Sequence, residues 1–358
     1  MKEKISVLMI APHPDKTLGG MSSVIKNYNS SDLKRNLNYK FLASAVDGTK
    51  IQKISIFICS YIKALIILLF CNIDIIHIHS ASRGSFIRKS YFVKLSKFFK
   101  KKIILHIHGA EFEQYYKNEC SKKQQLYIRN TFNLCDLVIA LGDEWKKKIQ
   151  EYCDVEILVL NNAIKIPNEN LYNINSNNIT LLGRLDKRKG TFDVIESAKD
   201  IKKKYPKLKI VLAGDGDIEK VKLKIKEYGL EDTVSVLGWI NESKRNQILK
   251  DTKIYILPSY NEGMPMSILE AMSYGIPVIS SNVGSIPTLI KNGINGYLIE
   301  AGDTKSLANN ILKLVENKNL RNIISKNNYS EVKEKFSIES NIEKLIKIYN
   351  KILDKDFI

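Results

Sequence analysis

The sequence lacks the cysteine patterns that mark zinc sites, redox centres and disulfide scaffolds. Its five cysteines are odd in number and widely spaced, with no C-x-x-C pair, so most are expected to be small buried side chains. The apolar run at residues 5–11 is short and leads directly into Pro12, which favours a first buried strand over a signal peptide. Together these features predict a cytoplasmic protein.

Nucleic-acid-binding motifs are also missing: there is no C2H2 finger, no RNP-type aromatic strand and no long basic arm. The chain nevertheless carries 56 Lys and Arg against 38 Asp and Glu, a formal net charge of +18. Solvated lysines on helix faces explain part of this excess. A positive field of this size attracts anionic lipid and phosphorylated substrates. We therefore expect an anionic membrane surface as a partner and no nucleic acid.

One apolar run, residues 54–71, is just long enough to be considered as a membrane span. Lys63 stands in its middle, where insertion of a lysine costs about 2.5–3.5 kcal/mol. The run also leads straight into the strand-like segment 73–79. These features favour a buried crossover helix of an α/β domain, and a helix lying in the membrane interface is the alternative.

Short apolar runs alternate with helical stretches along most of the chain, the pattern of parallel sheets covered on both faces. With 358 residues, 44% of them apolar, the chain fits two domains. In the first half, strands are expected at 5–12, 39–45, 73–79, 102–108, 137–141 and 156–160. Helices are expected between them at 20–28, 52–70, 85–100 and 125–135.

A polar, asparagine-rich segment at 168–178 interrupts this alternation and predicts a domain boundary. Strands then resume at 180–183, 209–213, 233–237, 254–257 and 277–280, with helices at 191–205, 218–228, 242–251 and 266–274. Beyond 307 the pattern is helical. We predict two Rossmann-like doubly wound domains, 1–165 and 166–340, facing across a cleft with the ligand at the strand ends. A terminal helix, 341–358, is expected to return to the first domain.

The segment 261–270 places Glu262 in the loop after a strand and Glu270 in the following helix. Pro265 suits a first helical turn because its missing N–H would be unpaired there. Free N–H groups at a helix start, with the positive end of the helix dipole, hold phosphate or sugar oxygens. Both glutamates are able to accept hydrogen bonds from sugar hydroxyls. The donor-binding candidates in this turn are Gly263, Met264, Pro265 and Met266.

A second motif, 183–190, is a glycine turn with Arg184 near its start and Lys189 near its end. Cleavage of a bond between a sugar and a diphosphate builds negative charge on the leaving oxygens, and these two cations are suited to stabilise it. A basic surface turn is the alternative.

These residues resemble the retaining GT-B glycosyltransferases of family 4, within glycosyl transferases group 1. Glu262 to Glu270 correspond to the family's E-x7-E element, followed by the segment 271–278. Further matches are Gly183-Arg184 with Lys189-Gly190, Gly214-Asp215-Gly216, and Gly19-Gly20. Each is weak alone, but their order and spacing are specific, and the resemblance covers nearly the whole chain.

The resemblance implies a role for each matching residue. Arg184 and Lys189 would grip the donor diphosphate, Glu262 would contact the transferred sugar, and Glu270 would contact the ribose hydroxyls. His108 would approach the donor sugar. The other donor-binding positions implied are the glycines Gly19, Gly20, Gly183, Gly214 and Gly216, and the backbone at Ile240 beside the nucleobase.

Histidines recur on two expected strands, at 77 and 79 and again at 106 and 108. Alternation along a strand puts each pair on one face, a spacing that also suits a metal. For His77, His79 and His106 we favour hydrogen-bonded strand histidines over metal ligands, and we expect no metal site.

The sequence thus predicts a metal-independent, retaining hexosyltransferase-type enzyme. It would move a sugar from a UDP- or GDP-linked donor to a saccharide or lipid-linked acceptor in surface polysaccharide or glycoconjugate assembly. The nucleotide sugar is the substrate, no cofactor is expected, and the protein would be peripheral at the inner face of the membrane. A nucleotide-sugar epimerase and a catalytically inert sugar-nucleotide-binding subunit of a membrane assembly are the alternatives.

Overall fold

The computed structural model describes residues 4–353, so the outermost positions of the expected ranges 1–165 and 341–358 lie outside it. The chain forms two compact units, Met1–Lys165 with Ser337–Ile358, and Ile166–Phe336. The first division falls where the sequence places it. The second unit ends at Phe336 rather than at 340, and the chain rejoins the first unit from Ser337 onward.

The first unit is built on a parallel six-stranded sheet in the order β2-β1-β3-β4-β5-β6. All six strands expected in this half are present, with ends that differ by a few residues. They are β1 (Ser6–Pro12), β2 (Asn38–Ala45), β3 (Ile75–Ser80), β4 (Lys102–Ile107), β5 (Leu137–Ala140) and β6 (Ile157–Val159). Runs of isoleucine, leucine and valine keep most of β1, β3, β4 and β5 buried, as expected for a sheet covered on both faces.

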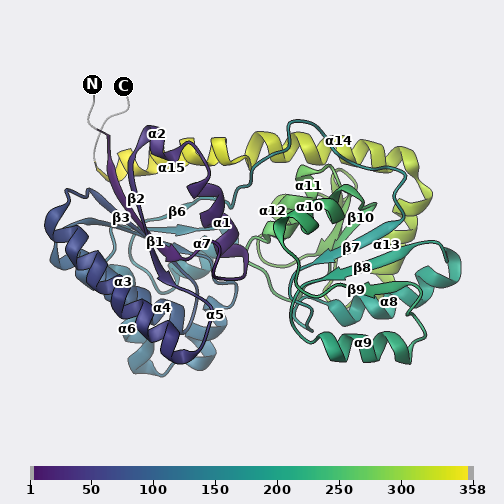
Figure 1. Cartoon of the computed structure of the whole chain (residues 1–358), viewed down its shortest axis with the longest axis horizontal. Coiled ribbons are helices and arrows are strands. Elements are labelled where there is room, and N and C mark those ends of the chain that lie inside the picture. The colour runs from purple at the N-terminus through teal and green to yellow at the C-terminus, as the bar shows by residue number, and fades with distance from the viewer. Residues whose placement is uncertain (1–3, 354–358) are drawn as a thin grey trace. The chain divides into compact units, whose positions relative to one another are not determined.

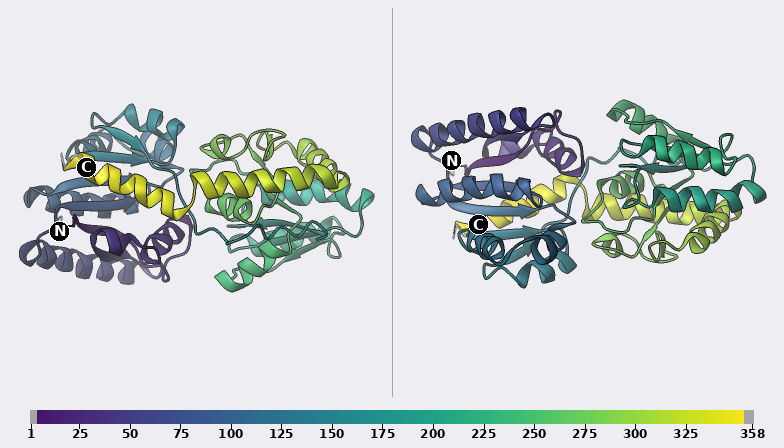
Figure 2. Two further views of the ribbon diagram at one scale, coloured as in Figure 1. Left: turned by 90° about the horizontal axis from the view of Figure 1, so that it is seen from above. Right: turned by 90° about the horizontal axis from the view of Figure 1, so that it is seen from below.

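Two layers of helices cover this sheet (Figure 1). Alternate strand residues such as Ile76, Ile78 and Leu105 share a core with Phe92 of α4 and Leu68 of α3. On the other face, α15 lies along the sheet (Figure 2). The helices are α1 (Gly20–Asn29), α2 (Leu33–Asn36), α3 (Lys50–Phe70), α4 (Gly84–Phe98), α5 (Phe112–Gln114), α6 (Lys122–Asn133), α7 (Asp143–Gln150) and α15 (Ile338–Ile352), with a π-helix at Tyr115–Glu119.

Helix α3 differs from the expectation for residues 54–71. It is the crossover helix predicted between β2 and β3, and Thr49 and Gln52 form a capping box at its start. It is not a buried helix, however: only 17% of its apolar window is buried. Its long aliphatic side chains therefore lie mostly on the surface.

The second unit contains another parallel six-stranded sheet, in the order β12-β11-β10-β7-β8-β9. Its strands are β7 (Asn178–Leu182), β8 (Lys209–Ala213), β9 (Val234–Val236), β10 (Ile254–Leu257), β11 (Val278–Ser281) and β12 (Gly296–Ile299). The first five were expected, and β12 was not. The helices are α8 (Thr191–Lys204), α9 (Ile218–Glu227), α10 (Glu242–Lys250), α11 (Met266–Ser273), α12 (Ile286–Leu289), α13 (Thr304–Glu316) and α14 (Lys318–Lys335).

The strand order of the second sheet reverses between β7 and β10, which lie side by side although two β-α units separate them in sequence. Loops that leave the carboxyl ends of two such strands diverge to opposite faces of the sheet, and ligands of doubly wound folds bind in the resulting crevice. The loops in question are 183–190 after β7 and 258–265 after β10. Both expected motifs therefore lie at the switch point.

Candidate active site

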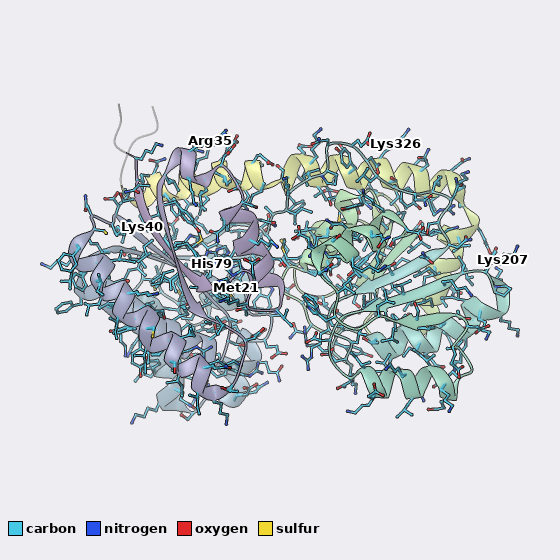
Figure 3. All side chains as sticks on the ribbon, viewed as in Figure 1. Met21, Arg35, Lys40, His79, Lys207 and Lys326 are labelled. Atoms are coloured by element: carbon cyan, nitrogen blue, oxygen red, sulfur yellow. The ribbon has the colours of Figure 1, made fainter. Side chains whose placement is uncertain are left out.

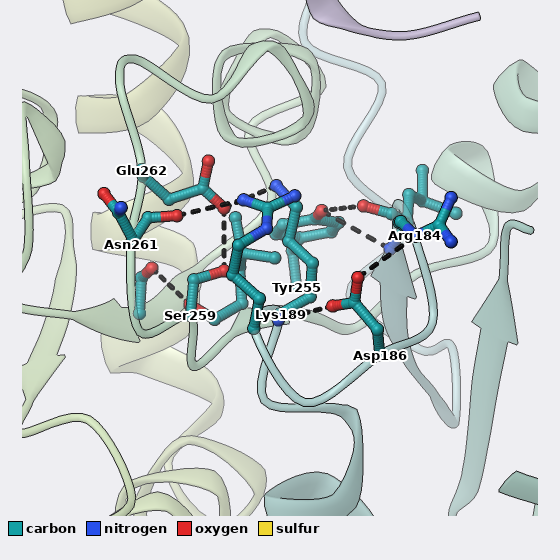
Figure 4. Close-up of polar contacts among 11 residues, drawn as sticks. Arg184, Asp186, Lys189, Tyr255, Ser259, Asn261 and Glu262 are labelled. Carbon is teal, nitrogen blue, oxygen red and sulfur yellow. Dashed lines mark hydrogen bonds and ion pairs between the residues drawn. The ribbon is translucent and has the colours of Figure 1, made fainter. Parts of the chain in front are cut away.

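The two loops at this switch point are joined by a lysine–glutamate pair (Figure 4). Lys189 Nζ lies 2.5 Å from Glu262 Oε1, and the two side chains are 14% and 6% exposed. Ser259 Oγ donates a second hydrogen bond to the same carboxylate oxygen, at 2.7 Å. The structure thus brings together one predicted cation and one predicted carboxylate, and it adds Ser259, which no sequence motif identified.

A glycine allows the two loops to approach each other. Gly190 follows Lys189 and has a φ of 70°, in the left-handed region. A Cβ at this position would lie 2.1 Å from the carbonyl oxygen of Pro258 in the other loop. Asp186 Oδ1 accepts the backbone N–H of Lys189 at 2.9 Å and tightens the same turn. Only glycine permits this close approach, so Gly190 positions the Lys189–Glu262 pair.

Arg184 lies in the same loop but faces different partners. Its Nε is 3.2 Å from Asp186 Oδ2 and its Nη1 is 3.4 Å from Asp215 Oδ2, and its side chain is 54% exposed. Exposed ion pairs of this kind contribute little stability. The guanidinium is therefore free to exchange these carboxylates for a more highly charged anion.

The predicted glycines at the ends of β7 and β8 pack backbone against backbone. A Cβ on Gly214 would lie 1.7 Å from the carbonyl oxygen of Gly183, and one on Gly216 would lie 2.6 Å from that of Leu185. The Gly214 N–H also donates to the carbonyl of Gly238, which follows β9. These contacts hold three strand-end loops together. They place the half-buried Ile240, two residues beyond Gly238, at the same end of the sheet.

Glu270 has a partner that the sequence did not reveal. Arg245 of α10 lies 3.0 Å from Glu270, which extends from α11 and is 14% exposed. Burial raises the pKa of Glu270, and the Arg245 guanidinium opposes that rise. Arg245 belongs to no recognisable motif, and only the packing of α10 beside α11 brings it to this carboxylate.

The turn before α11 is held by the loop after β11. Ser285 N–H donates to the carbonyl of Gly263 at 2.9 Å, and Met264 and Met266 are both buried. Pro265 is the N-cap residue, and α11 begins at Met266. The expectation that Pro265 stands in the first turn is therefore off by one position, because the residue keeps an extended backbone.

In the first unit, Gly19 and Gly20 lie where β1 gives way to α1. Gly19 is the N-cap of α1 with a φ of 115°, a conformation that favours glycine. A Cβ added to it would meet no atom within 4 Å. The backbone at this helix start is therefore open to a ligand approaching close to it.

His77 and His79 on β3, His106 on β4 and His108 directly after β4 form one cluster of rings in contact. His79 and His106 are register partners on β3 and β4, and Figure 3 labels His79 in its place on the sheet. His79 Nδ1 lies 2.8 Å from His108 Nε2, and His77 Nδ1 lies 2.7 Å from the hydroxyl of Tyr349 in α15. His77, His79 and His106 thus make hydrogen bonds as expected, whereas Nε2 of His79 and Nε2 of His106 have no hydrogen-bond partner among the described residues.

Burial keeps these imidazoles neutral. Burial lowers the pKa of His77 and of His108 to about 3. It also holds the pKa values of His79 and His106 well below the ordinary range. Charge repulsion from neighbouring rings adds to the lowering at His77, His79 and His106. Nitrogen atoms of His77, His79 and His106 lie within 4.8 Å of one another, a spacing that a metal ion spans.

Three comparisons identify what this arrangement resembles. Residues 163–331 match the family described as glycosyl transferases group 1. An Escherichia coli protein, UDP-Gal:alpha-D-GlcNAc-diphosphoundecaprenol alpha-1,3-galactosyltransferase, is 35% identical over 179 residues, which make up 49% of this chain and 46% of that protein. This chain therefore matches only about half of the length of that relative.

Solved structures match over a longer stretch. Sucrose-phosphate synthase from Thermosynechococcus elongatus has a TM-score of 0.82 at 14% identity, covering 99% of this chain and 100% of that chain. Anabaena HepE in complex with UDP-glucose has a TM-score of 0.77 at 18% identity, covering 97% and 100%. At these identities the likeness concerns the fold alone, and it confirms the GT-B fold with its two Rossmann-like units.

The matched residues 163–331 begin at the end of the first unit and contain β7 to β12, both switch-point loops and the Lys189–Glu262 pair. The second unit of this chain is accordingly similar to the glycosyl transferases group 1 family over most of its length.

Proposed function

We propose that this chain is a glycosyltransferase that moves a sugar from a nucleotide diphosphate sugar to a saccharide or lipid-linked acceptor. The observation that carries the proposal is the Lys189–Glu262 pair at the switch point of a unit that resembles the group 1 family. A lysine and a carboxylate side by side suit a ligand that is anionic at one end and rich in hydroxyls at the other. That description fits a sugar diphosphate.

In this proposal the donor diphosphate binds against Lys189 and Arg184. Lys189 is nearly buried, so its charge acts in a medium of low polarity where it stabilises a phosphate strongly. Arg184 is half-exposed and only weakly held by Asp186 and Asp215, so it turns to the phosphate at little cost. The glycines Gly183, Gly214 and Gly216 keep side chains away from the same strand ends.

The other predicted residues take the remaining parts of the donor. Glu262 and the turn formed by Gly263, Met264, Pro265 and Met266 hold the transferred sugar. Glu270, oriented by Arg245, accepts hydrogen bonds from the ribose hydroxyls. The backbone near Ile240 contacts the base of a UDP- or GDP-linked donor. Gly19 and Gly20 present the amides of the α1 start to phosphate or acceptor.

We propose that transfer retains the anomeric configuration. The acceptor oxygen bonds to the anomeric carbon as the bond from that carbon to the phosphate oxygen breaks, and the departing phosphate oxygen takes the acceptor proton. Arg184 and Lys189 balance the charge that develops on this oxygen, which makes the reaction metal-independent. His108 is neutral and so acts as a hydrogen-bonding group toward the sugar. Neither glutamate acts as a nucleophile.

The setting proposed for this reaction is surface polysaccharide or glycoconjugate assembly at the cytoplasmic face of a membrane, without a cofactor. The name of the Escherichia coli relative specifies a diphosphoundecaprenol-linked acceptor, which supports a lipid-linked acceptor here. The net charge of +18 supports work beside anionic lipid.

Incubation with a panel of UDP- and GDP-sugars, with and without lipid-linked acceptors, tests the proposal. A transferase releases nucleoside diphosphate only when acceptor is present, with turnover retained in EDTA and an unchanged anomeric configuration by NMR. Conversion of the donor sugar without acceptor would identify an epimerase. Tight donor binding with no turnover under any condition would identify an inert binding subunit.

A further inference from the structure

Helix α3 presents its large apolar side chains to the solvent. Ile51, Ile54, Ile58, Ile62, Ile66, Leu69 and Phe70 are all between 49% and 82% exposed. They recur every three or four residues, so they form one stripe along the 21-residue helix. Single exposed aliphatic residues are common on soluble proteins, but a continuous stripe of this length marks an interaction surface.

The opposite side of α3 is already packed against the protein. Its buried residues are Ser60, Ala64 and Leu68, and the last two belong to the core of the first unit. Phe57 and Tyr61 contact the ring of Phe92 in α4 at centroid distances of 5.9 and 5.7 Å. The helix is thus fixed to its sheet and does not cross a bilayer alone, although its mean hydropathy of 2.1 would allow it.

Helix α4 extends this surface. It lies beside α3, where Phe57 meets Tyr91 edge to face at 5.7 Å, and its Tyr91 and Phe98 are 47% and 80% exposed. We call the exposed side chains of both helices the α3–α4 face. Its residues are the α3 stripe, Tyr91, Phe98, Lys50, Lys63, Lys94 and Lys97.

The charges of the two helices are all of one sign. Helix α3 contains three lysines and α4 contains three lysines and one arginine, and neither contains an aspartate or glutamate. Of these, Lys63 and Lys94 are exposed within the apolar surface itself. Apolar side chains with basic residues around them are the combination that binds at the interface of an anionic membrane, where lysine stems lie along the apolar region and their ammonium groups reach the headgroups.

We propose that the α3–α4 face docks onto the surface of an anionic lipid bilayer, with α3 lying along the headgroup boundary. A second copy of the chain is a poorer occupant. In a symmetric dimer this face would meet itself and place lysines against lysines without any acid to compensate. The inference deepens the proposed work on lipid-linked acceptors. Its test measures binding alone, so its failure is distinguishable from the failure of transferase activity.

Vesicle co-sedimentation tests the docking surface. The wild-type chain is expected to bind phosphatidylglycerol vesicles more tightly than phosphatidylcholine vesicles and to lose affinity as salt is raised. The variant Ile58→Gln/Ile62→Gln/Ile66→Gln removes three aliphatic side chains from the stripe. Its partition coefficient on phosphatidylglycerol should fall by about tenfold or more, since membrane binding scales with apolar burial.

The matched control replaces aliphatic residues of similar exposure elsewhere. Leu126, Leu223 and Ile323, on α6, α9 and α14, are 58%, 68% and 58% exposed, and their triple Gln variant should bind vesicles like wild type. Circular dichroism and thermal unfolding verify that both variants fold. Equal loss in the two variants, or binding indifferent to salt and lipid charge, would overturn the proposal. So would a dimer in analytical ultracentrifugation that only the α3 variant dissociates.

Discussion

Replacement of Lys189 by methionine separates two functions of that lysine. In the folded protein its ammonium lies 2.5 Å from a carboxylate that is only 6% exposed. Without this cation, the hydrogen bond from Ser259 is the remaining described contact of the Glu262 carboxylate. Breaking one side of a buried ion pair costs about 3–5 kcal/mol. The thermal midpoint of the second unit should therefore fall by roughly 6–20 °C.

The double variant Lys189→Met/Glu262→Gln removes both charges and keeps an amide that accepts the Ser259 hydrogen bond. Most of the lost stability should return, because no charge is left buried without a partner. Turnover should not return, since the cation facing the donor phosphate is missing in both variants, and kcat should fall by about 10²–10³ in each.

Thermal unfolding and a nucleoside-diphosphate release assay measure these two quantities in parallel, and Glu262→Gln alone serves as the matched single variant. A double variant that regained turnover together with stability would show that Lys189 does not serve the donor phosphate. A Lys189→Met variant with unchanged thermal midpoint and kcat would rule out both functions of the lysine.

Three further predictions concern other contacts. Arg245→Met removes the cation beside Glu270, so the pKa of this carboxyl should rise further. The acid limb of the kcat/KM profile should then move to higher pH, and KM for the donor should increase; an acid limb at the same pH would contradict this. Gly190→Ala should lower the thermal midpoint and turnover together, because its Cβ would meet the Pro258 carbonyl; a wild-type midpoint would contradict the geometry. His77 has a pKa of about 3 when folded against an ordinary value of about 6.5, so the unfolded state binds a proton that the folded state does not. The contribution of His77 to stability should therefore fall as pH drops from about 6.5 toward 3, by about 2 kcal/mol at pH 5, and the other three histidines of the cluster add to the loss. Urea unfolding at pH 7.5 and 5 should show this loss, and it should shrink in His77→Gln.

The parallel strands and the main pair of site residues were accessible to sequence reasoning. Runs of buried isoleucine, leucine and valine mark β1, β3, β4 and β10 without reference to any other part of the chain. Lys189 and Glu262 each follow a strand of this kind, so the rule that ligands bind at carboxyl strand ends brings them together.

Other features depend on packing that no local pattern encodes. Strand β12 begins with a glycine, a residue that weakens a strand pattern, and it was not expected from the sequence. Arg245 reaches Glu270 only because α10 lies beside α11. Helix α3 is apolar nearly all round, a composition that normally indicates burial, so the sequence could not tell which side of it would face the solvent.

In the proposed function, the switch-point loops of the second unit hold the diphosphate of a nucleotide sugar. Isothermal titration of the wild-type chain with UDP and with GDP, and of Lys189→Met/Glu262→Gln with the same ligands, tests it most directly. At least one of the two ligands should bind the wild type, and its affinity for the double variant should be about tenfold or more lower. Failure of both ligands to bind the wild type, or equal affinity for the two proteins, would contradict it.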